Sequence, residues 1–401
     1  MRPDSAIAII RELRRRGHEA YLVGGCVRDM VMGIEPADYD IATSAHPEEI
    51  VTIFPRTETI GAKFGVVLVI YQGHPFEVAT FRSDDAYVDG RRPTSVSFTD
   101  ANQDVLRRDF TINGLLYDPI TERIIDYVNG QADIQAKLVR AIGDPRARFE
   151  EDKLRILRAV RFGARLGYRV EPATWEAVCA MAPAIHQVSS ERIREELLRI
   201  LTEGQAVRGI RMLEESGLRK QILPELEWTQ HLERSVELLR AGLEPDFAMA
   251  LLLHETPVDQ VQRIIERLKF SRAEIHHVLA LAGNLPSFYN ARSMSVSALK
   301  RFFRLVRFED HLALARIHGI AAGEDLEDYS FVSRKHQEWT EADITPAPLI
   351  SGEDLIGLGF VPGPQFKEIL SRVEDEQLEG RLSEHSQALS FVLQHYGKSK
   401  S

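Results

Sequence analysis

The sequence predicts an α+β fold, with a small mixed sheet near the N-terminus followed by a helical remainder. Strand-like apolar runs are confined to the first third of the chain, at 21–23, 66–71 and 76–81. From residue 204 onward the apolar residues recur at helical spacing, with Gly and Pro between the segments and no strand-rich block. Two regions of different secondary structure within 401 residues indicate several domains.

Composition excludes several classes of protein. The apolar fraction is 44%, as in an ordinary globular chain, and no apolar run approaches the roughly 20 residues that a membrane span needs. Residues 1–20 have the pattern of an amphipathic helix with charges throughout, unlike a signal peptide. Two cysteines, Cys26 and Cys179, form neither a disulfide framework nor a zinc site, so a cytoplasmic location is expected. Nothing in the sequence predicts the oligomeric state.

The charge distribution allows nucleic-acid binding only at a local surface. The net charge of −10 argues against binding over the whole surface. Residues 137–169, however, contain ten Lys and Arg against four Asp and Glu. This segment is interpreted either as a solvated helix face or as an RNA-binding groove, and its position in the fold distinguishes the two.

The first predicted elements are a helix, a strand and a glycine turn. Ser5 is expected to cap the helix and Gly17 to end it. The first strand then leads into Gly24 and Gly25, which lack a Cβ and let the backbone approach a ligand closely. A short helix that carries Arg28 follows.

Carboxylates on the next two strands suggest a metal site. Asp38 and Asp40 lie two residues apart on an apolar segment, so on a strand they would point to the same face. A divalent cation relieves their repulsion, and Mg²⁺ prefers one or two carboxylates together with substrate phosphates. Glu77 is interpreted either as a third carboxylate of this site or as a surface residue on an edge strand. A glycine turn for phosphates beside two aspartates suggests nucleotidyl transfer.

The segments that follow add a capped helix, a loop and an arginine-rich turn. Residues 44–54 have the pattern of a capped helix, and 82–98 have no period and are interpreted as a functional loop. Further on, Arg108 precedes Asp109, which is expected to be a helix N-cap, with Asn113 four residues later.

Residues 148–168 are predicted to form one long helix. Along it, Asp152 and three arginines recur every three residues and are therefore neighbours on the helix surface. Taken alone, this pattern is typical of salt bridges within a helix.

Taken together and in this order, these segments resemble the motifs of the class II tRNA nucleotidyltransferase and bacterial poly(A) polymerase family, within the DNA polymerase β superfamily. Motifs A to E are matched by residues 24–43, 106–118, 126–144, 148–168 and 191–201. Residues 82–98 resemble the family's flexible loop, and 349–380 resemble the tail of bacterial CCA-adding enzymes. The resemblance implies a nucleotidyltransferase head at 1–136, a helical neck at 137–203, a helical body at 204–323 and a tRNA-binding helical tail at 324–401.

The resemblance also implies roles for residues in the head. Asp38 and Asp40 would hold two Mg²⁺ ions. Gly25 and Arg28 would contact the nucleotide phosphates, and Arg108 would assist at the ribose or the triphosphate.

In the neck, the resemblance implies recognition of the incoming base. Asp152 and Arg155 would read the base, with Arg158 and Arg161 behind them. The reaction would be in-line attack of the tRNA 3′-hydroxyl on the α-phosphate of CTP or ATP, with release of pyrophosphate.

Within the family, CCA addition is the favoured activity. CC-adding enzymes typically shorten the flexible loop, whereas residues 82–98 look intact. The basic features of bacterial poly(A) polymerases are absent at 60–67 and in the acidic tail. An A-adding enzyme that works with a separate CC-adding enzyme shares the visible motifs and is the alternative. An inactive RNA-binding relative is less favoured, because Asp38 and Asp40 are both present.

A short string at His254, reading HET, faintly resembles the HD phosphohydrolase motif of some relatives. Glu255 stands where that motif has its metal-binding Asp, and no second cluster of the same kind is evident in the sequence. We therefore expect a packed helix end at this position.

Overall fold

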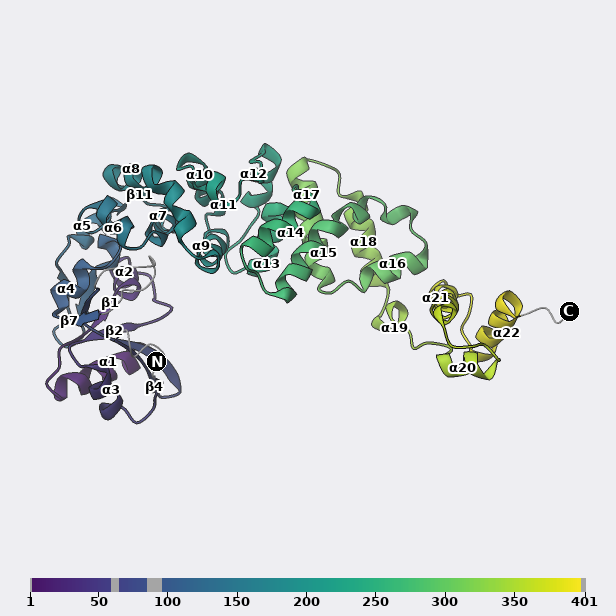
Figure 1. Cartoon of the computed structure of the whole chain (residues 1–401), viewed down its shortest axis with the longest axis horizontal. Coiled ribbons are helices and arrows are strands. Elements are labelled where there is room, and N and C mark those ends of the chain that lie inside the picture. The colour runs from purple at the N-terminus through teal and green to yellow at the C-terminus, as the bar shows by residue number, and fades with distance from the viewer. Residues whose placement is uncertain (1, 59–64, 85–95, 398–401) are drawn as a thin grey trace. The chain divides into compact units, whose positions relative to one another are not determined.

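The computed structural model describes residues 2–58, 65–84 and 96–397. Its strands lie in the N-terminal part of the chain, and helices alone follow (Figure 1), which confirms the predicted α+β class. The chain divides into two compact units, residues 1–227 with 239–245 and 263–270, and residues 228–238 with 246–262 and 271–401. Within the described residues, no helix is both long and apolar enough to cross a membrane.

The first unit is built on a mixed seven-stranded sheet with strand order β3-β4-β5-β2-β1-β8-β9. Strands β2 and β5 are parallel, and the other neighbouring pairs are antiparallel. The strands are β1 (Ala20–Val23), β2 (Asp40–Thr43), β3 (Thr57–Glu58), β4 (Val66–Tyr71), β5 (His74–Thr80), β8 (Leu115–Asp118) and β9 (Arg123–Asp126).

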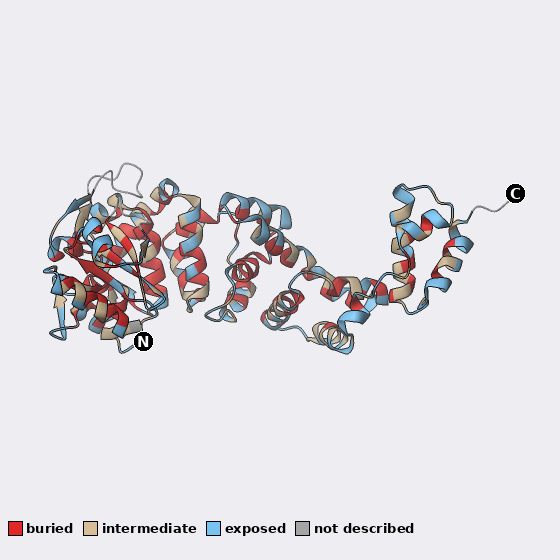
Figure 2. Ribbon diagram, turned by 90° about the horizontal axis from the view of Figure 1, so that it is seen from below, coloured by how far each residue is buried: buried red, intermediate tan, exposed pale blue. Residues whose placement is uncertain are grey.

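Apolar residues that alternate along the strands form the core of this unit, and Figure 2 shows buried residues concentrated along the strands of the sheet. One buried cluster joins Val23, Ala42, Phe81, Val105 and Leu116. The helices around the sheet are α1 (Arg2–Arg15), α2 (Gly25–Val31), α3 (Pro47–Ile53), α4 (Ala101–Leu106) and α5 (Gly130–Ala136).

The predicted loop at 82–98 lies mostly outside the described residues. Its two ends are described, and they pair as an antiparallel ribbon of β6 (Arg82–Asp84) and β7 (Val96–Phe98).

Two predicted helix starts are wrong. Helix α1 already begins at Arg2, and the hydroxyl of Ser5 donates to Gln72 Oε1 at 3.0 Å instead of capping. Helix α3 begins at Pro47 rather than near Ser44, because the His46 backbone N–H donates to Glu49 Oε2 at 2.8 Å in a capping box.

The predicted long helix at 148–168 is also wrong, because it is broken at Asp152. Helix α6 (Pro145–Glu151) ends there, and α7 (Leu154–Arg165) begins two residues later. Asp152 adopts an extended backbone, with φ −141° and ψ 103°, and its Oδ1 accepts from the Leu154 backbone N–H at 3.1 Å. An aspartate that accepts from the backbone N–H two residues later forms a local turn that competes with the helix, and this turn favours the break.

Helices α9 and α10 pack against α7, and α11 packs on η3 and α10. A short parallel pair, β10 (Leu138–Val139) and β11 (Arg169–Val170), flanks α7. The helices are α8 (Pro172–Met181), η3 (Ala182–Gln187), α9 (Ser190–Thr202), α10 (Ala206–Glu215) and α11 (Leu218–Ile222).

The second unit is helical throughout its described residues, and α17 packs against α12, α15 and α18. Its last three helices share a small separate core around Leu355, Ile369 and Val392. Helices α13 and α14 are continuous across the unit boundaries. From α12 onward the helices are α12 (Gln230–Glu237), α13 (Pro245–Leu253), α14 (Val258–Arg267), α15 (Arg272–Tyr289), η4 (Ala291–Ser293), α16 (Val296–Phe303), α17 (Phe308–Ala322), α18 (Glu327–Glu338), α19 (Glu341–Ile344), α20 (Gly352–Gly357), α21 (Pro364–Leu378) and α22 (His385–Tyr396).

Candidate active site

A glycine turn connects β1 to α2 at the edge of the candidate site. Gly24 has φ 74° and ψ −131°, a conformation that is strained for any residue with a Cβ. A Cβ at this position would also lie 3.1 Å from Arg108 Nη1, whereas a Cβ on Gly25 would make only an ordinary contact of 3.7 Å with Arg28 Nη2. The turn therefore requires glycine at Gly24 and brings the backbone beside two arginines.

We expect Gly24→Ala to weaken both the fold and nucleotide binding. Alanine at such a φ costs about 1–3 kcal/mol of folding stability, and its Cβ would displace the Arg108 guanidinium. Urea unfolding measures the first effect, and KM for the nucleotide measures the second.

Gly33→Ala is the matched control, since Gly33 has φ 71° and a Cβ there would meet no described atom within 4 Å. This control should lose stability without a change in KM. A KM that rises equally in both variants would show that the contact with Arg108 does not matter.

Arg28 lies in the wall of the site, and its side chain is held from two sides. Its Nε and Nη2 donate to Asp29 Oδ1 at 2.9 and 2.7 Å, and its Nη1 donates to Asn113 Oδ1 at 2.8 Å. The Arg28 guanidinium is also 5.5 Å from the ring centre of Phe162. These contacts fix a buried positive charge beside the glycine turn.

Asp40 begins β2 and lies among other carboxylates. Asp40 is exposed to the open cavity, but desolvation by the surrounding protein, together with the charges of Glu77 and Asp38, raises its pKa to about 6, and Arg108 opposes the shift. Glu77 is on β5, whose residue Val78 pairs with Ile41, the residue after Asp40. Strand β5 lies between β4 and β2, so the interpretation of Glu77 as an edge-strand residue is wrong.

Asp38 lies just before β2 rather than within it, so the two aspartates are not placed by strand alternation as expected. Its side chain is exposed, and its charge acts on Asp40. Asp38 and Glu77 both place negative charge near Asp40, and a divalent cation with oxygen ligands would stabilise the ionised form of Asp40. The three carboxylates are not close enough to one another to form a single three-residue metal group.

Arg108 is oriented by an acid that sequence analysis missed. The buried Asp104 accepts from Arg108 Nη2 at 3.0 Å and from Arg107 Nη2 at 2.7 Å. Arg108 Nε is buried and has no hydrogen-bond partner among the described residues. Asp104 lies on α4, three residues before Arg107, which is the C-cap of that helix, and four residues before Arg108. This spacing is the signal in the sequence that could have revealed both ion pairs.

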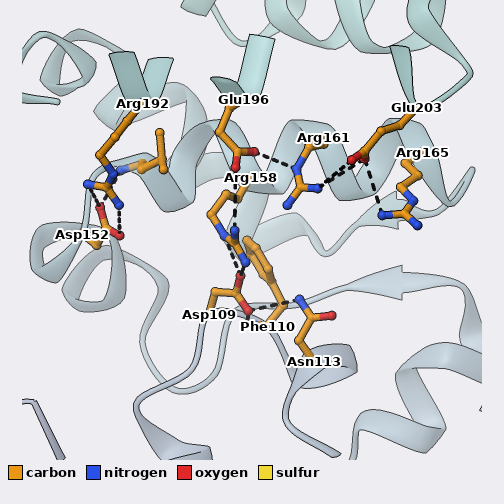
Figure 3. A network of polar contacts seen from close by, with 11 residues as sticks. Asp109, Phe110, Asn113, Asp152, Arg158, Arg161, Arg165, Arg192, Glu196 and Glu203 are labelled. Atoms are coloured by element: carbon orange, nitrogen blue, oxygen red, sulfur yellow. Dashed lines mark hydrogen bonds and ion pairs between the residues drawn. The ribbon is translucent and has the colours of Figure 1, made fainter. Parts of the chain in front are cut away.

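Asp109 is buried beneath the site, and it is not the N-cap of a helix as predicted. It is followed by a single 3₁₀ turn, η2 (Thr111–Asn113), whose N-cap is Phe110. Asp109 Oδ2 instead accepts from Arg158 Nε at 2.8 Å and Nη2 at 2.5 Å, and Oδ1 accepts from Asn113 Nδ2 at 3.1 Å (Figure 3). Burial alone would raise the pKa of Asp109, but Arg158 and Asn113 hold it at about 2.

Asp152 extends from the break between α6 and α7 and pairs with an arginine that sequence analysis also missed. Arg192 Nη1 donates to Asp152 Oδ1 at 3.1 Å, and Arg192 Nη2 donates to Oδ2 at 2.8 Å (Figure 3). Arg192 comes from α9, inside the segment at 191–201 that resembles motif E. Its bidentate pairing orients the carboxylate strongly.

Arg155 is buried and is held mainly by the backbone. Its Nη1 donates to Glu151 Oε2 at 2.7 Å and to the Arg148 carbonyl at 3.0 Å, and its Nη2 donates to the Arg107 carbonyl at 2.8 Å. The last bond joins α7 to the end of α4 and so couples the helical segment to the sheet domain.

Arg161 and Arg165 continue the arginine row along α7. Arg161 Nε donates to the buried Glu196 Oε2 at 2.7 Å, and its Nη1 lies 3.2 Å from Glu203 Oε2. Arg165 Nη1 lies 3.5 Å from the same Glu203 oxygen (Figure 3). These two arginines therefore pair with α9 and with Glu203, the residue that ends it, whereas Arg155 pairs with Glu151 four residues earlier.

The glycine turn, Asp40, Asp152 and the arginines described above line one cavity of about 540 Å³ within the first unit, whereas Asp38 and Glu77 are not part of its lining. The cavity is strongly basic, because ten arginines and three aspartates line it among the described residues. Its lining comprises Gly24, Gly25, Arg28, Asp40, Arg82, Arg107, Arg108, Asp109, Asn113, Asp152, Leu154, Arg155, Arg158, Arg161, Phe162, Arg165, Arg192 and Arg199. The volume and charge suit a small, multiply charged anion such as a nucleoside triphosphate.

Three family profiles match successive parts of the chain. "Poly A polymerase head domain" covers residues 20–140, "Probable RNA and SrmB- binding site of polymerase A" covers 167–229, and "tRNA nucleotidyltransferase domain 2 putative" covers 245–392. The CCA-adding enzyme of Levilactobacillus brevis is 32% identical over 389 residues, which is 96% of each chain.

The chain belongs to the CCA-adding enzyme family.

Other members of the family are similar to this chain over nearly its whole length. The CCA-adding enzyme of Streptococcus pneumoniae is 33% identical over 399 residues, or 97% of this chain and 96% of the relative. A crystal structure of the Bacillus stearothermophilus CCA-adding enzyme in complex with CTP is 28% identical, with a TM-score of 0.80 over 98% of both chains. Nucleotidyltransferases of this kind generally use a divalent metal.

Proposed function

We propose that this chain adds C, C and A to the 3′ end of tRNA, using CTP and ATP and releasing pyrophosphate. The observation that carries this proposal is the single cavity that is lined by Asp40, by Asp152 and by ten of the described arginines, which we call the arginine wall. Its three parts suit the reacting end, the triphosphate and the base of one nucleotide. The relatives that span the chain are CCA-adding enzymes, and a similar solved structure is a complex with CTP.

The triphosphate would lie against the glycine turn and the arginines beside it. Gly24 and Gly25 leave room for close approach of the backbone, and Arg28 and Arg108 supply positive charge there. The unpartnered Arg108 Nε is a donor that a phosphate oxygen would satisfy.

Asp38 and Asp40 would hold two Mg²⁺ ions, with Glu77 as a third carboxylate nearby. The negative charges of Glu77 and Asp38, which add to desolvation in raising the pKa of Asp40, support this assignment. When bound, the ions lower the pKa of the attacking hydroxyl and stabilise the departing pyrophosphate.

The base would be read by Asp152 and Arg155. Asp152, when ionised, only accepts hydrogen bonds, and an arginine only donates them. The Arg155 guanidinium has five N–H groups. Three hydrogen bonds, to two backbone carbonyls and to Glu151, leave further N–H groups that can donate to a base. Arg158 and Arg161 would lie behind this pair and hold it through Asp109 and Glu196.

In the reaction, the tRNA 3′-hydroxyl oxygen forms a new bond to the α-phosphorus. The bond from that phosphorus to the bridging oxygen of the β-phosphate breaks, and the hydroxyl proton passes to solvent. The arginine wall orients the triphosphate for in-line attack and offsets the charge on the departing pyrophosphate, so positioning and electrostatics supply most of the rate.

The assignment of functions along the chain follows the expected division. The head at 1–136 would carry the chemistry, the neck at 137–203 base recognition, and the body at 204–323 and tail at 324–401 would bind tRNA. A cytoplasmic location follows from the proposed substrate, since tRNA is used there.

Labelled-nucleotide incorporation tests the proposal directly. The substrates are tRNA transcripts that lack CCA, transcripts that end in CC, and an RNA with an unrelated 3′ end. We expect two C residues and one A on the first, one A on the second, and none on the third. Addition of A alone, only after CC, would assign the A-adding activity instead, and long A tails would assign poly(A) polymerase activity. No incorporation at all would indicate an inactive RNA-binding relative.

A further inference from the structure

Three histidines from distant parts of the sequence meet in the second unit. His231 lies on α12, His254 directly follows α13, and His318 lies on α17. Each offers a ring nitrogen, and these nitrogens all lie within 4.8 Å of one another. The three ring centres are 4.6 to 5.5 Å apart. The packed helix end expected at His254 is present, but it forms part of a cluster that the sequence alone does not reveal.

Two of the rings present buried nitrogens that lack partners. His254 Nδ1 lies 2.6 Å from the Leu251 carbonyl, which can only accept, so the proton is on Nδ1 and Nε2 carries a lone pair. His254 Nε2 and His318 Nδ1 are both buried without a hydrogen-bond partner among the residues that the structure describes. Such groups cost folding free energy unless a ligand satisfies them.

Glu255 and Thr229 orient the third ring. Glu255 Oε2 accepts from Thr229 Oγ1 at 2.7 Å, and Glu255 Oε1 contacts His231 Nδ1. His231 Nε2 lies 3.1 Å from the His318 carbonyl oxygen, which can only accept, so a proton on Nε2 would donate to that oxygen. A cation at the cluster would take the place of that proton.

These contacts have the form of the outer contacts around metal-binding histidines. Such a histidine donates its other ring N–H to a carboxylate or a backbone carbonyl, which fixes the tautomer and the ring orientation. Here the Leu251 carbonyl does this for His254, and Glu255 does it for His231.

We propose that His231, His254 and His318 bind one divalent transition-metal ion, such as Zn²⁺, which joins helices α12, α13 and α17. Imidazole nitrogens favour zinc, nickel and copper ions over Mg²⁺. Ligands about 2.0–2.1 Å from a tetrahedral Zn²⁺ lie roughly 3.4 Å apart, so small ring rotations would close the observed spacing. His231 and His318 are half-buried, which gives the ion a path from solvent.

The ion would stabilise the second unit. Helix α12 packs on α17, and the ion would add a bond between them and to the end of α13. A ligand that binds only the folded state raises the unfolding temperature. None of the three histidines lines the nucleotide cavity, so this site is separate from the proposed chemistry.

Zn²⁺ titration of the full-length protein, without a polyhistidine tag and in excess Mg²⁺, tests the proposal. The Mg²⁺ occupies oxygen-ligand sites such as Asp40. We expect one equivalent of Zn²⁺ to bind by calorimetry and metal analysis, and the unfolding temperature to rise by several degrees. His231→Ala, His254→Ala and His318→Ala should each reduce the affinity at least tenfold. His276→Ala, which alters an exposed histidine on α15 in the same unit, is the matched control and should bind like wild type.

The wild-type protein alone also decides the question if the variants fail to fold. X-ray absorption of the zinc-loaded protein should show about three imidazole ligands. A shell of oxygen atoms only, no stoichiometric binding in the presence of Mg²⁺, or unchanged affinity in folded variants of the three histidines would each overturn the proposal.

Discussion

Asp40→Asn is expected to reduce nucleotide incorporation by roughly a thousandfold or more without destabilising the protein. Metal ions stabilise transition-state charge by several kcal/mol, which corresponds to about three powers of ten in rate. Asparagine keeps the shape of Asp40 but removes the charge that would hold the cation. The measurement is single-turnover incorporation of CTP and ATP at saturating Mg²⁺.

The stability that wild-type Asp40 contributes should depend on pH in the opposite sense to that of an ordinary salt-bridged acid, and Asp40→Asn should lack this dependence. The pKa of Asp40 is raised from 3.8 to about 6 in the folded protein, so folding favours its protonated form. That contribution is present in full below pH 4 and is lost as the pH rises through about 6. Without metal, Asp40→Asn should therefore match wild type near pH 4 and unfold at a higher temperature near pH 8. Added Mg²⁺ should raise the unfolding temperature of wild type only.

Two further variants sharpen the test. Glu58→Gln removes an exposed carboxylate from strand β3 at the edge of the same sheet and should change neither activity nor Mg²⁺ stabilisation. Glu77→Gln should weaken Mg²⁺ binding if Glu77 belongs to the metal site. Wild-type turnover by folded Asp40→Asn would refute the assignment of Asp40.

The second large effect is expected in base selection. Asp152→Ala should lower kcat/KM for CTP and ATP and bring both closer to the values for UTP and GTP. The ratio of preferred to rejected nucleotides should fall at least tenfold.

This expectation follows from the hydrogen-bonding edges of the bases. Cytosine presents an amino donor beside a ring-nitrogen acceptor, and adenine does the same. Uracil and guanine present a carbonyl acceptor beside a ring N–H donor. A carboxylate acceptor next to a guanidinium donor thus matches the first pair and opposes the second at both positions. Each unmatched buried group costs about 1–3 kcal/mol, so two mismatches reject a base strongly without a nucleic-acid template.

Glu176→Ala is the control for base selection. Glu176 pairs with Arg146 at 3.3 Å, and both side chains are exposed and do not line the described cavity. This variant should keep the wild-type ratios for all four nucleotides. Arg192→Ala should resemble Asp152→Ala in part, because Arg192 orients the carboxylate through two hydrogen bonds. If Asp152→Ala keeps the wild-type ratios, the carboxylate does not read the base.

The fold class and the neighbourhood of the site could be predicted because they depend on local patterns. Strand β4 was predicted at 66–71 from a continuous apolar run, and the structure has Val66–Tyr71. The string from Gly24 to Asp40 is close in sequence, so its turn, helix and strand follow from residue type and order. The sites of Asp40, Arg108 and Asp152 also fall in one cavity, as the family resemblance implied.

Partners that are distant in sequence could not be predicted. Asp109 was interpreted as a helix cap because nothing nearby indicates Arg158, which lies 49 residues away. Residues 148–168 looked like one helix because the break depends on Asp152, whose carboxylate is held by Arg192 from another helix. The three histidines of the second unit lie on separate helices and have no shared spacing. Burial and tertiary pairing override local pattern at these positions.

The cavity has a consequence for how such a protein can change over time. Every described residue that lines it lies between Gly24 and Arg199, in the first half of the chain. A mutation that alters which nucleotide is accepted therefore leaves the helices after α11 untouched. Conversely, those helices can change in sequence, be replaced or adapt to a different RNA while the nucleotide preference stays the same. Natural selection can act on the two halves almost independently.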